Sequence, residues 1–233
     1  MEYRVEDKYI ITEDKAAYIE AMLKEVCEPD AHGVGGRYNI RSVYFDDMYD
    51  TCLRENEAGT DNREKYRIRS YDINASVIHL ELKSKLRGYT HKDSIELSKK
   101  EAISLLNRND RLWSDMEADS LGVNRDTYLI KKLCAKMQYL RMQPVVLIEY
   151  ERTAYTYRVG NVRITFDRNI GVSRDYMELW DNTPYMMPVM PRGQLILEIK
   201  YDELLPDYIR QIVDIGSLNK TAYSKYYYGR ISI

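Results

Sequence analysis

The sequence is poor in several residue types, and each shortage narrows the class of protein. Among 233 residues there are only two Phe, two Trp, three Cys and three His. The cysteines, Cys27, Cys52 and Cys134, form neither a CxxC pair nor a metal-ligand spacing, which indicates a reducing compartment. No apolar run approaches the roughly 18 residues of a membrane-spanning helix, and the N-terminus lacks the apolar segment of a signal peptide. We therefore expect a cytoplasmic protein without membrane insertion.

The sequence also lacks an excess of charge of either sign. Its 35 Lys and Arg are balanced by 37 Asp and Glu, so the formal net charge is −2 at pH 7. A general nucleic-acid binder carries a net basic surface, so nucleic acid is not an expected partner and any anion site must be local. No Pro/Gly/Ser-rich linker, low-complexity run or internal repeat divides the chain, which predicts a single domain over residues 1–233.

Tyrosine and segments of alternating charge are what the sequence has instead. The 22 tyrosines suit strands and amphipathic walls better than an apolar interior. In segment 63–71, Arg-Glu-Lys-Tyr-Arg-Ile-Arg-Ser-Tyr, strand periodicity places four basic residues on one side and Tyr66 and Ile68 on the other. A solvated strand face would explain this segment alone, but the same layout recurs along the chain.

The hydrophobic periodicity predicts a mixture of strands and helices. Strands are expected over residues 3–11, 38–45, 63–71, 77–85, 92–98, 145–155, 161–167 and 195–201. Helices are expected over residues 13–27, 49–54, 98–107, 125–141, 206–215 and 219–229. Ser98 and Glu101 have capping-box spacing, and Gly160 is expected at the turn of a hairpin. The pattern gives no regular element for 108–124 and no assignment for 175–191.

Several expected strands combine an apolar face with a face bearing Arg or Lys and an occasional Glu. An open sheet would expose the charged face to water, whereas a closed barrel would place it in the lumen and leave the apolar face for the helices. We expect the second arrangement, an α+β fold with a closed antiparallel β-barrel, a charged lumen and helices packed on the outside.

A lumen lined by cations requires an anion, because unpaired cations in a partly desolvated space repel each other. Arg and Lys match phosphate groups, so a polyphosphate is the expected occupant. The carboxylates among the cations, Glu6, Glu81 and Glu198, need not all be ion-pair partners. Their hard oxygens are the ligands that Mg²⁺ or Mn²⁺ prefers.

A series of short motifs in this order resembles a known family. The motifs are Arg4-x-Glu6-x-Lys8-Tyr9, Arg41-Ser42-x-Tyr44-Phe45-Asp46, Lys65-Tyr66-Arg67-Ile68-Arg69, Glu81-x-Lys83-x-Lys85, Arg152-x-Ala154-Tyr155, Arg163-Ile164-x-Phe166-Asp167, Leu197-Glu198-x-Lys200 and Ser224-Lys225-Tyr226. Over essentially the whole chain, the series resembles the VTC domain. This is the polyphosphate polymerase module of vacuolar transporter chaperone complexes and stand-alone bacterial relatives, within the CYTH or triphosphate tunnel metalloenzyme superfamily.

The resemblance implies a phosphotransferase with a tunnel that holds a nucleoside triphosphate, with ATP the expected one. The γ-phosphate would pass to phosphate or a growing polyphosphate chain, with Mn²⁺ or Mg²⁺ present. The implied catalytic phosphate ligands are Lys8, Arg67, Arg69, Lys83, Arg152, Arg163, Lys200 and Lys225. The further substrate-binding residues are Lys65, Lys85, Lys92 and Ser224. Glu198 is the implied metal ligand and Glu6 a candidate one.

The sequence departs from the family pattern in two places. Phosphatases of the superfamily open with Glu-x-Glu-x-Lys, and Arg4 in place of the first Glu favours the polymerase over the triphosphatase branch. A basic residue often found near Asn56 is absent. A hydrolase of tripolyphosphate or nucleoside triphosphate and a non-catalytic polyphosphate-binding module stay open as alternatives, as does a membrane-protein partner.

Some of the candidate residues also have ordinary structural explanations. Glu198 could form a salt bridge with a neighbouring cation, and Glu6 could merely pair with Lys8. Lys225 could be a solvated residue on a helix. The Tyr223–Tyr228 cluster is more typical of helix packing than of a platform for stacking a base.

Overall fold

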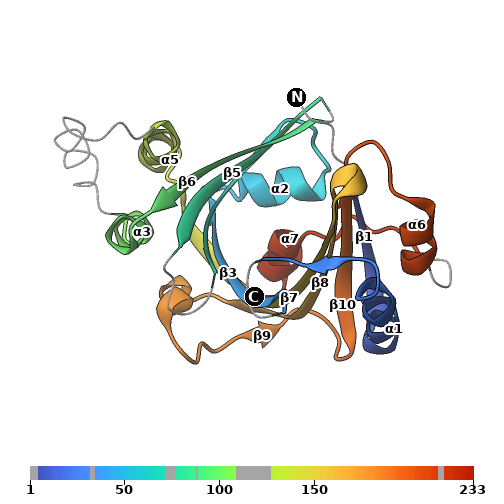
Figure 1. The fold of residues 1–233 in the computed structure, drawn as a ribbon. Coiled ribbons are helices and arrows are strands. Elements are labelled where there is room, and N and C mark those ends of the chain that lie inside the picture. Colours follow the sequence, from blue (N-terminus) through green and yellow to red (C-terminus); the bar gives the residue numbers. More distant parts are fainter. Residues whose placement is uncertain (1–4, 32–34, 72–76, 88, 109–126, 215–217) are drawn as a thin grey trace. The chain divides into compact units, whose positions relative to one another are not determined.

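The computed structural model describes residues 5–31, 35–71, 77–87, 89–108, 127–214 and 218–233 (Figure 1). The chain divides into two compact units. The first unit comprises Met1–Ile40, Glu149–Gly171 and Met187–Tyr228. The second unit comprises Arg41–Ile148, Val172–Met186 and Gly229–Ile233. Each unit is built from segments far apart in the sequence.

The strands belong to a ten-stranded antiparallel sheet with the order β1-β10-β8-β7-β3-β4-β5-β6. Their bounds are β1 Val5–Thr12, β3 Arg37–Asp46, β4 Arg63–Tyr71, β5 Ile78–Leu86, β6 Tyr89–Leu97, β7 Gln143–Tyr157, β8 Val162–Ser173 and β10 Gln194–Tyr201. The two-residue strands β2 (Glu28–Pro29) and β9 (Met187–Pro188) pair with β7 and β8. The strand order ends at β1 and β6, and no pairing joins these two strands within the described residues. The sheet is therefore open, and the expected closed barrel is not confirmed.

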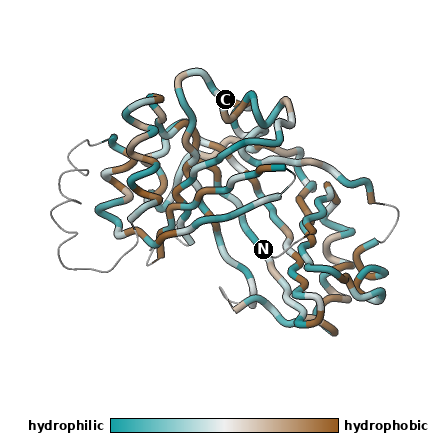
Figure 2. The backbone as a smooth tube through the Cα atoms, turned by 90° about the horizontal axis from the view of Figure 1, so that it is seen from above, coloured by the Kyte–Doolittle hydropathy of each residue, from teal (hydrophilic) through white to brown (hydrophobic). Residues whose placement is uncertain are grey.

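In the first unit, helices cover one face of the strands. Residues of β1, β8 and β10 that point to this face form an apolar cluster with α1 (Glu13–Leu23) and α6 (Asp207–Val213). Ile19, Phe166 and Leu197 in this cluster are fully buried. Because side chains alternate along a strand, the neighbouring residues point to the opposite, charged face. Figure 2 shows hydrophilic and hydrophobic residues interspersed along the chain.

The second unit has the same two-faced design. On β4 and β5 the apolar side chains of Tyr66, Ile68, Leu80 and Leu82 are buried. Helix α5 (Tyr128–Tyr139) contacts β5 and β6, α3 (Lys99–Leu106) contacts β6, and α2 (Thr51–Glu57) contacts β4 (Figure 1). The expected placement of helices on the apolar side of the strands is confirmed for α1, α6 and α5. It is wrong for α7 (Lys225–Ile231), because Lys225 contacts Asp167 on the opposite, charged side.

The predicted elements are found with shifted bounds, and one prediction is wrong in part. The last helix, α7, spans Lys225–Ile231, so residues 219–224 before it are not helical. Thr221 donates its backbone N–H to the Lys8 carbonyl oxygen at 2.8 Å, and Tyr9 forms a β-bridge with Lys220. This segment therefore pairs with the edge of β1. The unassigned stretch 175–191 contains a 3₁₀ helix (Tyr176–Trp180) and β9, whereas 109–124 lies outside the described residues.

Two predicted local motifs are confirmed. Ser98 and Glu101 form the capping box of α3, with the Glu101 backbone N–H donating to Ser98 Oγ at 3.2 Å. Gly160 lies in the turn between β7 and β8 with φ +74°, and a Cβ at this position would clash with the Leu204 carbonyl oxygen. Glycine is required at this turn for both reasons.

Replacing Ser98 with alanine tests the capping box. The variant should lose about 1 kcal/mol of unfolding free energy, because the Glu101 backbone N–H at the start of α3 loses the Ser98 Oγ to which it donates. Chemical denaturation measures the change. Because the cap lies outside the charged faces, an accompanying loss of anion binding would contradict this purely structural assignment.

Candidate functional site

The charged face of the first unit is built by three neighbouring strands. Register places Glu6 on β1, Lys200 on β10 and Arg163 on β8 in one row. The next row of this face is formed by Lys8, Glu198 and Thr165. Residues directly opposite each other on neighbouring antiparallel strands lie close enough for their side chains to interact. The sheet thus brings together five of the predicted site residues.

Two carboxylates and two lysines of this face form a network of salt bridges. Lys8 Nζ lies 2.7 Å from Glu6 Oε1 and 3.6 Å from Glu198 Oε2. Lys200 Nζ donates to Glu198 Oε1 and lies 3.9 Å from Glu6 Oε2. The salt bridges considered as ordinary explanations for Glu6 and Glu198 are therefore present in the structure.

The pKa of Glu198 reflects these contacts. Burial alone would raise it, since only 5% of the residue is exposed. Lys200, Lys8, Arg152 and Lys225 outweigh burial and hold the pKa of Glu198 well below its ordinary value. Glu198 is therefore an ionised carboxylate at neutral pH, which is the form that a divalent cation requires.

A second group in the first unit centres on Asp167, a residue not predicted to belong to the site. Arg152 on β7 donates from Nε to Asp167 Oδ1 at 2.6 Å and from a terminal nitrogen to Oδ2 at 2.8 Å. Lys225 Nζ, at the start of α7, lies 2.6 Å from the same Oδ2. Burial alone would raise the pKa of Asp167, but Arg152 and Lys225 lower it to about 2. Strand alternation from Arg163 through Asp167 is the sequence signal that could have identified this residue.

The remaining candidates of the first unit have clear partners. Arg163 lies 2.6 Å from Asp30 Oδ2 and donates to the Tyr38 hydroxyl at 2.9 Å. Ser224 Oγ accepts from the Tyr227 backbone N–H at 3.3 Å, just before α7 begins, so Ser224 has a capping contact. The rings of Tyr223 and Tyr228 stack on each other with their centroids 4.3 Å apart, which agrees with the expectation that the Tyr223–Tyr228 cluster serves packing.

The charged face of the second unit is a grid on β4, β5 and β6. One row consists of Lys65, Lys83 and Lys92 on three successive strands. Like charges directly opposite each other destabilise a sheet, so this row favours a bound anion. The rows on either side begin with Arg67 and Glu81 and with Arg63 and Lys85. With the further row of Arg69, His79 and Glu96, the grid holds all predicted site residues of this unit together with two carboxylates, Glu81 and Glu96.

Glu81 is the counter-ion of this second face. Arg67 Nε donates to Glu81 Oε2 at 2.6 Å, and Lys92 Nζ lies 2.6 Å from Oε1. Arg69 is farther away, at 3.9 Å from Oε1. Burial alone would raise the pKa of Glu81, but Arg67, Arg69 and Lys92 lower it to about 2. Arg67 also donates to the Tyr44 hydroxyl at 3.0 Å.

The region around Asn56 has a polar contact in place of the basic residue common in the family. Lys65 Nζ donates to Asn56 Oδ1 from α2. Lys85 Nζ lies 3.8 Å from Asp61 Oδ1, where both side chains are partly exposed. Arg4, the other departure from the family pattern, lies outside the described residues.

The expectation that the carboxylates need not all be ion-paired is wrong. Glu6, Glu81 and Glu198 each contact at least one Lys or Arg. The physical reason is register, because each carboxylate lies directly across from a cation on the neighbouring strand: Lys200, Arg67 and Lys8 respectively. Any anion or metal that binds here must exchange with these existing pairs.

The donor set is compatible with a divalent cation that also binds phosphate. The described residues contain no group of three or more His, Cys, Asp or Glu side chains placed to hold a metal. Mg²⁺ commonly uses only one or two carboxylates and completes its shell with water and substrate phosphates. Glu198 and Glu6, joined through Lys8 and Lys200, can supply these two carboxylates.

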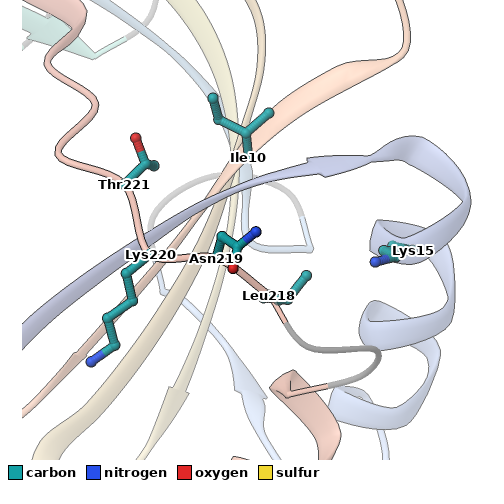
Figure 3. A pocket seen from close by; sticks show the side chains of 6 residues that line it. All are labelled: Ile10, Lys15, Leu218, Asn219, Lys220 and Thr221. Carbon is teal, nitrogen blue, oxygen red and sulfur yellow. The ribbon is translucent and has the colours of Figure 1, made fainter.

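An open pocket of about 340 Å³ lies between β1, the start of α1 and the segment 218–221 (Figure 3). Its lining residues are Ile10, Lys15, Leu218, Asn219, Lys220 and Thr221. None of them is a predicted site residue, and Lys220 Nζ pairs with Asp7 at 2.9 Å.

Comparisons with solved structures identify the fold. A putative adenylyl cyclase from Hippeastrum, described as revealing a dominant triphosphatase activity, aligns with a TM-score of 0.57 and 13% identity over 100% of this chain and 96% of that one. A putative adenylate cyclase from Bacillus halodurans aligns with a TM-score of 0.54 and 14% identity over 96% and 94% of the two chains. Similarity at these identities shows the fold alone. Comparison with curated proteins by sequence gives no match.

The family is established by sequence over nearly the full chain. The model of the VTC domain matches residues 3–233, which include every motif on which the resemblance was based. No described helix combines the length and apolar character needed to cross a membrane. The chain belongs to the VTC domain family.

Proposed function

We propose that this protein is a polyphosphate polymerase that transfers the γ-phosphate of ATP to the end of a growing polyphosphate chain. The observation that carries the proposal is the VTC domain match over residues 3–233. The cation-rich faces support it, because they hold the predicted phosphate ligands at adjacent strand positions. The proposal retains the expected single domain over residues 1–233, with an antiparallel sheet that is open within the described residues.

Phosphoryl transfer requires alignment and charge neutralisation more than covalent participation by the protein. We assign Arg67, Arg69, Arg152 and Arg163 to bind phosphate oxygens in the two-pronged manner of guanidinium groups. The lysines supply compact charges along the same faces; they are Lys8, Lys83, Lys200 and Lys225, with Lys65, Lys85 and Lys92 as further wall residues. Because many of these cations are held by carboxylates, phosphate binding replaces one anionic partner with another.

The acceptor needs no general base from the protein. A terminal phosphate oxygen is already ionised at neutral pH, so it can attack without losing a proton. The acceptor carries negative charge like the donor and requires cations along its own path. The row of Lys65, Lys83 and Lys92 supplies such charges in the second unit.

Glu198 and Glu6 are assigned to hold Mn²⁺ or Mg²⁺. When bound, the metal neutralises charge on the phosphate oxygens during transfer. Glu198 is suited to this because it is ionised and largely buried. A cytoplasmic location fits both the supply of ATP and the three free cysteines.

The proposal predicts that purified protein incubated with ATP and Mn²⁺ makes acid-labile phosphate chains longer than tripolyphosphate. Gel electrophoresis and ³¹P NMR of the products measure chain length directly. Loss of ATP with orthophosphate as the only product would instead establish a hydrolase. That alternative is favoured by the fold shared with the Hippeastrum protein described as a triphosphatase. Binding of polyphosphate without ATP turnover would establish a binding module.

A matched control separates the charged faces from other lysines. Lys220 pairs with Asp7, which points to the opposite face of β1 from Lys8. Lys220→Met should therefore make chains at the wild-type rate, whereas Lys200→Met should not. Equal rates for the two variants would contradict the assignment of Lys200.

A further inference from the structure

Asp167 is a fully buried carboxylate that holds two candidate phosphate ligands at once. Its exposed fraction is 0%, and it lies on β8 between Arg152 of β7 and Lys225 of α7. Arg152 contacts both carboxylate oxygens, at 2.6 and 2.8 Å, and Lys225 contacts the second oxygen at 2.6 Å. One side chain thus determines where two cations from separate parts of the chain lie.

An aromatic ring supports the same two cations. The guanidinium carbon of Arg152 lies 5.3 Å from the centroid of the Tyr150 ring, and Lys225 Nζ lies 4.8 Å from it. Both distances are within the range of cation–π attraction. Tyr150 is itself only 3% exposed, so the ring is a fixed support.

Stability alone does not account for this arrangement. A buried ion pair usually contributes little compared with well-packed apolar residues, because desolvation of the charges offsets their attraction. Here the ion pairs of Asp167 instead fix the positions of the Arg152 and Lys225 side chains. Fixing a lysine side chain costs rotamer entropy, and the contacts to Asp167 and Tyr150 restrict Lys225 before any ligand binds. The positions of Arg152 and Lys225 are therefore fixed when the protein folds, before phosphate binds.

We propose that Asp167, supported by the Tyr150 ring, is a positioning residue that orients Arg152 and Lys225 for phosphate binding. Asp167 does not touch phosphate, since its charge would repel it and both its oxygens already accept hydrogen bonds. The inference rests on the proposed function only in taking Arg152 and Lys225 as phosphate ligands. It holds whether the protein elongates, hydrolyses or only binds a phosphate chain.

A double-mutant cycle on inorganic tripolyphosphate binding, measured by calorimetry without metal, tests this role. Lys225→Met should weaken binding at least tenfold in the otherwise wild-type protein. In an Asp167→Asn background it should weaken binding threefold or less, because Lys225 is no longer held in place. If Asp167 merely competes with phosphate for Lys225, its removal frees the lysine and makes Lys225→Met more costly. An equal or larger cost, or no cost in either background, overturns the proposal.

Glu20→Gln provides the matched control background. Glu20 of α1 pairs at 2.9 Å with Arg168, the residue after Asp167, on the opposite face of β8. In this background Lys225→Met should weaken tripolyphosphate binding as much as it does in the otherwise wild-type protein. A smaller effect would show that Asp167→Asn acts only through a general loss of structural order, and would overturn the proposal.

A second variant covers the case in which Asp167→Asn does not fold, as judged by absence of a cooperative melting transition. Tyr150→Leu removes the ring and should likewise reduce the cost of Lys225→Met, whereas Tyr150→Phe should not. A full cost in both backgrounds would overturn the proposal. Absence of chain growth from ATP would refute the polymerase assignment while leaving this binding cycle fully interpretable.

Discussion

Replacing Glu198 with glutamine is expected to lower metal-dependent turnover at least ~100-fold while metal-free binding of tripolyphosphate persists. Glutamine keeps the shape of the side chain but lacks the charge that a divalent cation needs. In the structure Glu198 is ionised and held between Lys200 and Lys8. Loss of its charge should leave both lysines available to phosphate, so binding without metal should be unchanged or tighter.

A Mn²⁺ titration of turnover, combined with calorimetry of tripolyphosphate without metal, measures both parts of this prediction. Glu151→Gln is the matched control, since Glu151 of the same unit pairs with the exposed Arg37 at 3.1 Å. The control should behave as the wild type. Unchanged turnover of Glu198→Gln across the titration would remove Glu198 from the site.

The second large effect is expected from Arg67→Ala, which should weaken tripolyphosphate binding by about 1.5–3 kcal/mol, the scale of a charge-assisted hydrogen bond. The variant should also lose stability without ligand, because the buried Glu81 loses its closest partner. This loss should stay below the roughly 3–5 kcal/mol of a fully stranded buried charge. Lys92, at 2.6 Å from Glu81, and Arg69, at 3.9 Å, keep part of the compensation.

The two effects of Arg67→Ala can be separated by a second substitution. Adding Glu81→Gln should restore much of the stability, since no buried charge is then stranded, but it should not restore binding. Melting temperatures with and without tripolyphosphate report both quantities. Lys132→Ala is the control, because Lys132 pairs with Glu64 on the opposite face of β4. An Arg67→Ala variant that keeps the full ligand-induced rise in melting temperature would place Arg67 outside the site.

The strands could be predicted from sequence because alternation of charge and apolar side chains is a strong local signal. Segment 63–71 became β4 with its predicted bounds, and Tyr66 and Ile68 are fully buried as the alternation requires. The start of α7 could not be predicted in this way. Residues 220 and 221 pair with β1 instead of continuing the helix. Their partners, Tyr9 and Lys8, lie more than 200 residues earlier in the chain, so no local sequence pattern reveals the pairing.

The charge partners in the site were harder to predict than its cations. Which carboxylate faces which Lys or Arg depends on strand register, and the sequence of one strand does not determine the register of its neighbour. Glu81 therefore looked like an available oxygen ligand until β4 placed Arg67 directly across from it. Asp167 was missed for a related reason, because its partners come from β7 and α7.

The open sheet has a consequence for aggregation. A strand edge with unpaired backbone groups can recruit a strand from another molecule unless charge or covering chain prevents it. At β6 charged side chains lie on both faces, with Lys92 and Glu96 on one and Asp93 on the other, so an added strand would have to bury charge. At β1 the segment around Lys220 already occupies part of the edge. Both ends of the sheet are thus protected against edge-to-edge association. We therefore expect this route to aggregation to be suppressed even at high protein concentration.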